Sequence, residues 1–144
     1  MAEFPDRIYI DKDDKELYEK IKEEEMFQDK DIDNKDLFII AMAYGFKHEV
    51  KRKLDKKEGY VRTEYLNRED WGLINSVAVN DGLIDNLNDR ETVLKLAEEY
   101  AHGGIKLLCD YIDSVQYGSF DRQFEKELLD LFDELQYHKE TPEI

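Results

Sequence analysis

The segment from Asn34 to His48 constrains the fold of this chain more than any other, because it is apolar on nearly every side of a helix. Asn34 can cap the helix, and large apolar side chains fill most of the following positions: Leu37, Phe38, Ile40, Ala41, Met42, Tyr44 and Phe46. A helix that is apolar all round is buried on all sides. We therefore predict that residues 34–48 form the central helix of the domain.

Four further segments show the apolar period and the end signals of helices. They cover residues 13–27, 67–82, 89–113 and 120–137. Residues 59–66 alternate instead, with Val61, Thr63 and Tyr65 on one side, which is typical of a short strand. The predicted fold class is all-α, with about five helices and at most a minor two-stranded element near residues 59–66.

Three glycines are predicted to lie where helices pack. Gly45 falls in the central helix, and the pair Gly103 and Gly104 falls inside the longest one. Each glycine in a helix interior costs roughly 1 kcal/mol relative to alanine, so a pair marks a kink or a close helix crossing. We expect the helix over residues 89–113 to pack across the central helix.

The length of the chain, 144 residues, suits one domain of ordinary size. We expect a single helical domain over residues 13–138, a flexible N-terminal segment over residues 1–12 with only a weak strand signal at 7–10, and a flexible tail over 139–144. No apolar run approaches the roughly 20 residues of a membrane helix. The single cysteine, Cys109, fits a reducing compartment. The expected location is therefore the cytoplasm, without membrane contact.

Basic residues gather just after the central helix, although the net charge of the chain is -15. We call the following seven residues the basic patch: Lys47, Lys51, Arg52, Lys53, Lys56, Lys57 and Arg62. A basic region on an acidic body makes a dipolar surface that orients a charged partner. Either the patch contacts phosphates or an acidic partner, or it is a solvated loop whose cations pair with the protein's own acids.

Catalytic, metal and nucleotide motifs are not evident in the sequence. The histidines, His48, His102 and His138, lie in different segments without the spacing of a zinc site, and no phosphate-binding glycine loop is present. We therefore expect no metal and no cofactor. Glu98 and Glu99 fall on the polar side of the helix over residues 89–113 and are interpreted as solvating charges.

Two short stretches resemble a known family. Residues 36–47 read DLFIIAMAYGFK, residues 99–105 read EYAHGGI, and the similarity spans about residues 35–112. Both are similar to the small proteins called Dnd system-associated, which are encoded near DNA phosphorothioation genes in bacteria and archaea. The resemblance implies an accessory protein of a DNA modification and restriction defence system, and it carries over no catalytic residues.

The predicted function is that of a non-enzymatic accessory or regulatory protein, which binds a protein partner in a DNA-defence complex and also, weakly, DNA. One alternative is a divalent-metal-dependent nuclease or other hydrolase, with a site built from Glu98, Asp110 and Asp113. A second alternative is an acidic inhibitor that mimics DNA, with acidic faces at Glu23–Glu25 and Glu125–Glu134. The oligomeric state is left open.

Overall fold

The computed structural model describes residues 5–24, 32–82 and 89–114 of the chain. Within them lie four α-helices and one antiparallel sheet of two strands, so the predicted fold class is confirmed. The elements are β1 (Arg7–Asp11), α1 (Lys15–Glu23), α3 (Asn34–Lys47), β2 (Lys57–Arg62), α4 (Arg68–Asn80) and α5 (Arg90–Ser114). The helix predicted over residues 120–137 and the tail over 139–144 lie outside the described residues.

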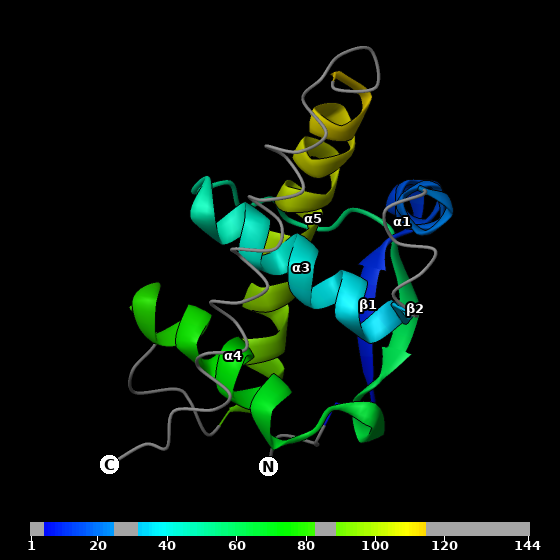
Figure 1. The fold of residues 1–144 in the computed structure, drawn as a ribbon. Helices are drawn as coiled ribbons and strands as arrows, with labels where there is room; N and C mark the ends of the chain where they lie inside the picture. The colour runs from blue at the N-terminus through cyan, green and yellow to red at the C-terminus, as the bar shows by residue number, and fades with distance from the viewer. Residues whose placement is uncertain (1–4, 25–31, 83–88, 115–144) are drawn as a thin grey trace.

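Helices α3 and α5 cross at the centre of the molecule. Helix α4 lies on one side of them, and the two-stranded sheet and α1 lie on the other (Figure 1). Helices α3, α4 and α5 begin where side-chain caps satisfy the free N–H groups of the first turn. Asp33 accepts a hydrogen bond from the backbone of Asp36 at the start of α3, and Asn67 and Asp70 form a capping box at the start of α4. Asp89 accepts one from Thr92 at the start of α5.

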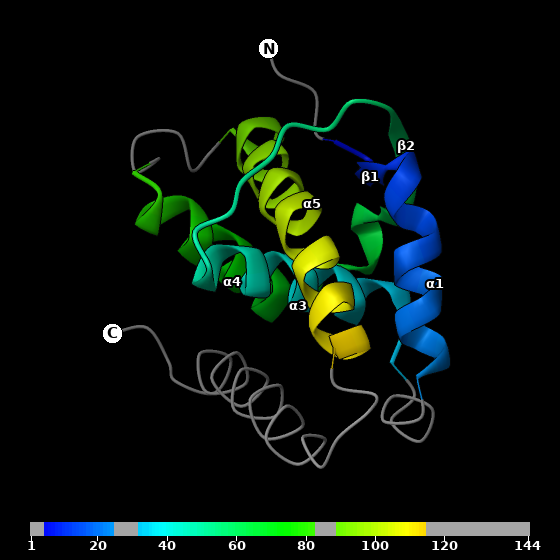
Figure 2. The ribbon, with the colours of Figure 1, turned by 90° about the horizontal axis from the view of Figure 1, so that it is seen from above.

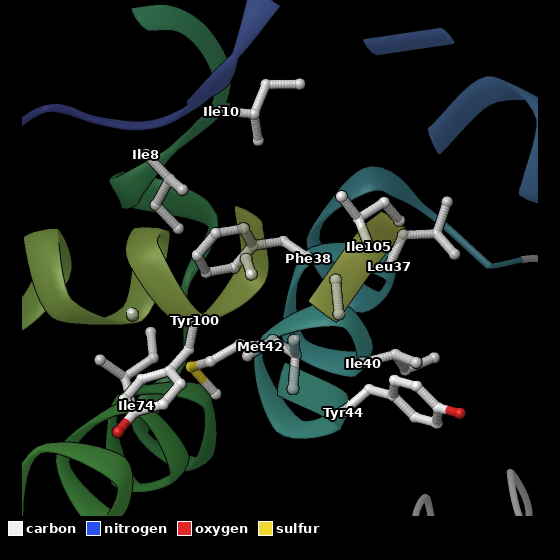
Figure 3. Close-up of a cluster of buried hydrophobic side chains, with 14 of the residues drawn as sticks. Ile8, Ile10, Leu37, Phe38, Ile40, Met42, Tyr44, Ile74, Tyr100 and Ile105 are labelled. Carbon is white, nitrogen blue, oxygen red and sulfur yellow. The ribbon is translucent and has the colours of Figure 1, made fainter. Parts of the chain in front are cut away.

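The N-terminal strand corrects one expectation. Residues 7–11 belong to the two-stranded sheet, not to a flexible segment, because β1 pairs antiparallel with β2. Ile8 and Ile10 of β1 are buried, and Ile8 belongs to the same hydrophobic cluster as Phe38 of α3 and Ile74 of α4 (Figure 3). Burial of these two isoleucines, which a weak local strand signal does not reveal, stabilises the N-terminal strand.

The crossing of α3 and α5 is a contact between backbones. A Cβ atom on Gly45 would overlap the carbonyl oxygen of Tyr100, and one on Gly104 would overlap that of Ala41. Helix α5 runs through the glycine pair without interruption, and a Cβ on Gly103 would meet the backbone of Val50. These three glycines therefore lie where α5 meets α3 and the segment that follows α3.

No helix among the described residues is both long and apolar enough to span a membrane.

Candidate functional site

The basic patch lies along the segment that links α3 to β2. Lys47 is the last residue of α3, Lys57 and Arg62 belong to β2, and the other four cations lie in residues 48–56, which we call the connecting segment. Figure 2 shows this segment running across α5 from the end of α3 to β2. All seven cations of the basic patch are exposed.

Two cations of the basic patch form ion pairs with the protein's own acids. The Lys51 ammonium lies 3.3 Å from a carboxylate oxygen of Asp81, and Arg62 lies 2.8 Å from Glu64. Lys47, Arg52, Lys53, Lys56 and Lys57 form no ion pair with any residue that the structure describes. In the described part of the chain, the protein's own acidic side chains thus form ion pairs with two of the seven cations.

Backbone hydrogen bonds hold the connecting segment against the rest of the molecule. Glu49 has a positive φ of 58°, and the chain turns there out of α3. The bonds join Val50 N to Gly45 O (2.9 Å), Arg52 N to Glu99 O (3.1 Å) and Lys12 N to Lys56 O (2.7 Å). The backbone is therefore fixed at its beginning, middle and end, while the basic side chains project into solvent.

A buried carboxylate adds a further attachment. Asp11, which is 2% exposed, accepts hydrogen bonds from the backbone N–H groups of Asp13 (3.0 Å), Asp55 (2.8 Å) and Lys56 (3.3 Å). Burial alone would raise the pKa of Asp11, but these three bonds outweigh it and lower the pKa below its usual value. Asp11 is therefore ionised at neutral pH and joins the end of the connecting segment, at Asp55 and Lys56, to the backbone of Asp13.

His102 lies beneath this carboxylate, between two aspartates. Its Nδ1 is 2.5 Å from Asp14 Oδ2, and its Nε2 is 3.8 Å from Asp11 Oδ2. Burial raises the pKa of Asp14, and the hydrogen bond from His102 opposes that shift. Among the described residues, no group of three or more histidine, cysteine or acidic side chains has the geometry to hold a metal ion. The cluster links η1 (Lys12–Asp14) to α5.

Glu98 does not lie on the polar surface where the sequence placed it. Its side chain is 5% exposed, and its carboxylate accepts a hydrogen bond of 2.8 Å from the backbone N–H of Tyr9 in β1. Burial raises the pKa of Glu98 to about 7, although this hydrogen bond opposes the shift. The interpretation of Glu98 as a solvating charge is wrong, because β1 covers this side of α5.

Glu98→Gln is expected to stabilise the protein at pH 8 and to leave it unchanged at pH 4. A folded-state pKa above the ordinary 4.5 means that ionised Glu98 opposes folding, and this cost grows as pH rises from about 4.5 to about 7. A shift of this size corresponds to roughly 3 kcal/mol. Glutamine has no charge, and its oxygen still accepts from Tyr9. Urea denaturation at both pH values measures the difference, and a gain equal at both pH values would contradict the assignment.

The three acids of the alternative metal site do not come together. Glu98 and Asp110 lie on the same helix, 12 positions apart, which separates them by about 18 Å along its axis. Asp113 forms an ion pair of 2.7 Å with Lys20 of α1. Asp110 is exposed, whereas Glu98 is buried. The described geometry thus gives no shared site for these residues.

Two lysines from other elements flank the basic patch. Lys12 is exposed, and its backbone N–H binds Lys56. Exposed Lys95 lies on α5 one helical turn before Glu99, whose carbonyl oxygen accepts the hydrogen bond from Arg52 N. Neither lysine adjoins the patch in the sequence, and only the fold brings them to it. Sequence reasoning missed both, because each stands singly in its own segment.

Of the acidic faces considered for DNA mimicry, the structure describes Glu23 and Glu24 near the end of α1. Glu25 and residues 125–134 lie outside the described residues.

Comparison with protein families identifies the chain. Residues 7–141 match the family described as DNA sulphur modification system-associated protein 4. The chain belongs to this family. The match begins at the first residue of β1 and includes the entire basic patch, so it extends beyond the resemblance seen over residues 35–112, and membership of a Dnd-associated family is confirmed. No curated protein and no solved structure matches the chain.

Proposed function

We propose that this protein is a non-enzymatic accessory component of a DNA sulphur modification system, and that it binds an anionic partner of that system through the basic patch. One observation carries the proposal. Five exposed cations of the patch have no ion-pair partner among the described residues, and the backbone that bears them is held in place. Because the backbone is already held, binding has to order only the side chains, and their positive charges are available to an anionic partner.

The buried ionisable groups support binding rather than catalysis. Such groups are candidates for chemistry when they line a site, but here each holds the fold together. Asp11 binds the connecting segment, His102 joins η1 to α5, and Glu98 binds the backbone of β1. Their perturbed environments therefore have a structural cause, and a catalytic role is not needed to explain them.

The charge of the whole chain favours a particular orientation of the partner. Residues 47–68 carry eight basic and four acidic side chains, while the chain has a net charge of -15. Such a molecule turns its basic side toward an anionic surface during approach. The partner is thus contacted through the patch.

The double variant Arg52→Glu with Lys53→Glu tests the proposal. Both residues are exposed and form no ion pair with a described residue, so the fold is expected to persist. The matched control reverses two exposed cations outside the patch, Lys20→Glu with Arg68→Glu, and the exposed Lys20–Asp113 pair that it removes contributes little to stability. Circular dichroism is used to check that both variants fold.

Each tagged protein is then purified from host cells, and the proteins and DNA of the modification system that accompany it are quantified. We expect the patch variant to lose at least one association of the wild type about tenfold or more, because two attractive contacts become repulsive. The control is expected to retain them all. A patch variant that keeps every association would contradict the proposal. Stronger binding of a basic protein by the patch variant would instead favour the DNA-mimic alternative.

A further inference from the structure

We infer that the anionic partner of the basic patch is the phosphate backbone of duplex DNA, bound without regard to base sequence, and that Lys12 and Lys95 take part in the contact. The inference rests on the proposed function, in which the patch binds an anionic partner. Chemistry, surface character and dimensions each distinguish phosphate from an acidic protein surface.

The cations of the patch are of a type that contacts phosphates and does not recognise individual bases. Of the five cations without an ion pair, four are lysines and Arg52 is the single arginine. Lysine carries a compact point charge. Recognition of a DNA sequence relies instead on paired hydrogen-bond donors, such as those of the arginine guanidinium. The backbone N–H groups of Arg52 and Asp55 are bonded within the protein. Binding must therefore come from distributed side-chain charge.

The surface around the patch lacks the anchors of a protein interface. Interfaces between proteins depend on a few buried aromatic or apolar side chains at their centre. Among the described residues, the exposed large apolar side chains are Tyr65 and Val79. The connecting segment contains neither, and Tyr65 stands three positions after Arg62, at the far end of the patch. A surface of lysines without apolar anchors gains affinity by releasing counterions from a polyanion, which is how proteins bind DNA phosphates.

The dimensions fit a duplex. An extended chain advances about 3.3 Å per residue, so Lys51 to Lys57 spans at most about 20 Å. Successive phosphates of one DNA strand advance about 3.4 Å along the helix axis, and the segment therefore covers about six base pairs. Lys12, bonded through its backbone to Lys56, and Lys95, one helical turn from the Glu99 carbonyl that binds Arg52 N, widen this track.

Fluorescence anisotropy with a labelled 20-base-pair duplex of unmodified DNA tests the inference. Seven phosphate contacts, from the five cations of the patch that form no described ion pair together with Lys12 and Lys95, predict a slope of log affinity against log salt of about -6.3, which is a loss of about 6,000-fold between 50 and 200 mM NaCl. Lys12→Gln and Lys95→Gln are each expected to make the slope shallower by about 1, and Arg52→Glu with Lys53→Glu by about 2 or more. The Lys20→Glu with Arg68→Glu control is expected to keep the wild-type slope.

A second duplex of permuted sequence and equal composition is expected to bind within about threefold, because the contacts are to phosphates. Absence of binding at 25 mM NaCl would overturn the inference. So would a slope that neither Lys12→Gln nor Lys95→Gln changes, or a strong preference for one sequence. If DNA does not bind but the patch variant still loses a protein of the system, this inference fails while the proposed function stands. If the patch variant changes no association, both fail.

Discussion

Gly104→Leu is expected to lower the free energy of unfolding by about 3 kcal/mol or more, at the upper end of overpacking effects or beyond. Any Cβ at this position would overlap the carbonyl oxygen of Ala41 and would also meet the backbone of Gly45. Backbone atoms at the centre of two packed helices cannot rotate away as a flexible side chain can. Helices α3 and α5 must then separate, and urea denaturation measures the resulting loss of stability.

Gly72→Ala is the matched control for this prediction. Gly72 also lies inside a helix, α4, but a Cβ there would meet no atom within 4 Å. Alanine is the better helix former, so this variant is expected to gain about 0.5–1 kcal/mol. A small effect of Gly104→Leu, comparable in size to that of Gly72→Ala, would show that the helices do not approach as closely as described.

Asp11→Asn is expected to cost about 2–4 kcal/mol and to release the connecting segment. One oxygen of Asp11 accepts from Asp13, and the other accepts from Asp55 and Lys56. An amide in place of the carboxylate turns its NH₂ group toward one set of these donors and leaves it without an acceptor. Amide hydrogen exchange should then accelerate at whichever set loses its acceptor, Asp13 or the pair Asp55 and Lys56, and urea denaturation should show the loss of stability.

Asp13→Asn serves as the control for Asp11, because Asp13 is an exposed neighbour in the same turn and its effect should stay within about 0.5 kcal/mol. The lowered pKa of Asp11 fixes the sign of the pH dependence. Its contribution to stability is present above the ordinary value of 3.8 and is lost as pH falls through the lower folded-state pKa. Exchange that is unchanged at Asp13, Asp55 and Lys56 alike in Asp11→Asn would contradict the attachment.

The helices were predictable because their signals are local. The segments predicted at residues 34–48 and 89–113 correspond to Asn34–Lys47 and Arg90–Ser114, since apolar period and capping residues lie within each segment. The strand at Arg7–Asp11 was not predictable with the same clarity. Its partner lies about fifty residues away, and its stability comes from pairing and from burial of Ile8, which are properties of the fold.

The candidate site also has one part that the sequence predicts and another that depends on the fold. The basic patch is a run of neighbouring residues, so charge counting along the sequence finds it. Its attachment through Asp11 and His102 joins residues 91 positions apart, and the burial of Glu98 depends on a strand from the other end of the chain. A helical pattern assigns Glu98 to the polar face, because that pattern contains no information about which elements cover the face.

The most direct test of the account is a map of backbone amide chemical shifts of the wild-type protein, titrated with a 20-base-pair duplex at low salt. We predict that the shifts cluster at residues 47–57, at Lys12 and at Lys95, and that they vanish as salt is raised, since the contacts are electrostatic. Residues 15–23 of α1 should not change. Shifts centred on α1 or α4, or no shifts at any residue, would contradict the claim that the basic patch is the functional surface.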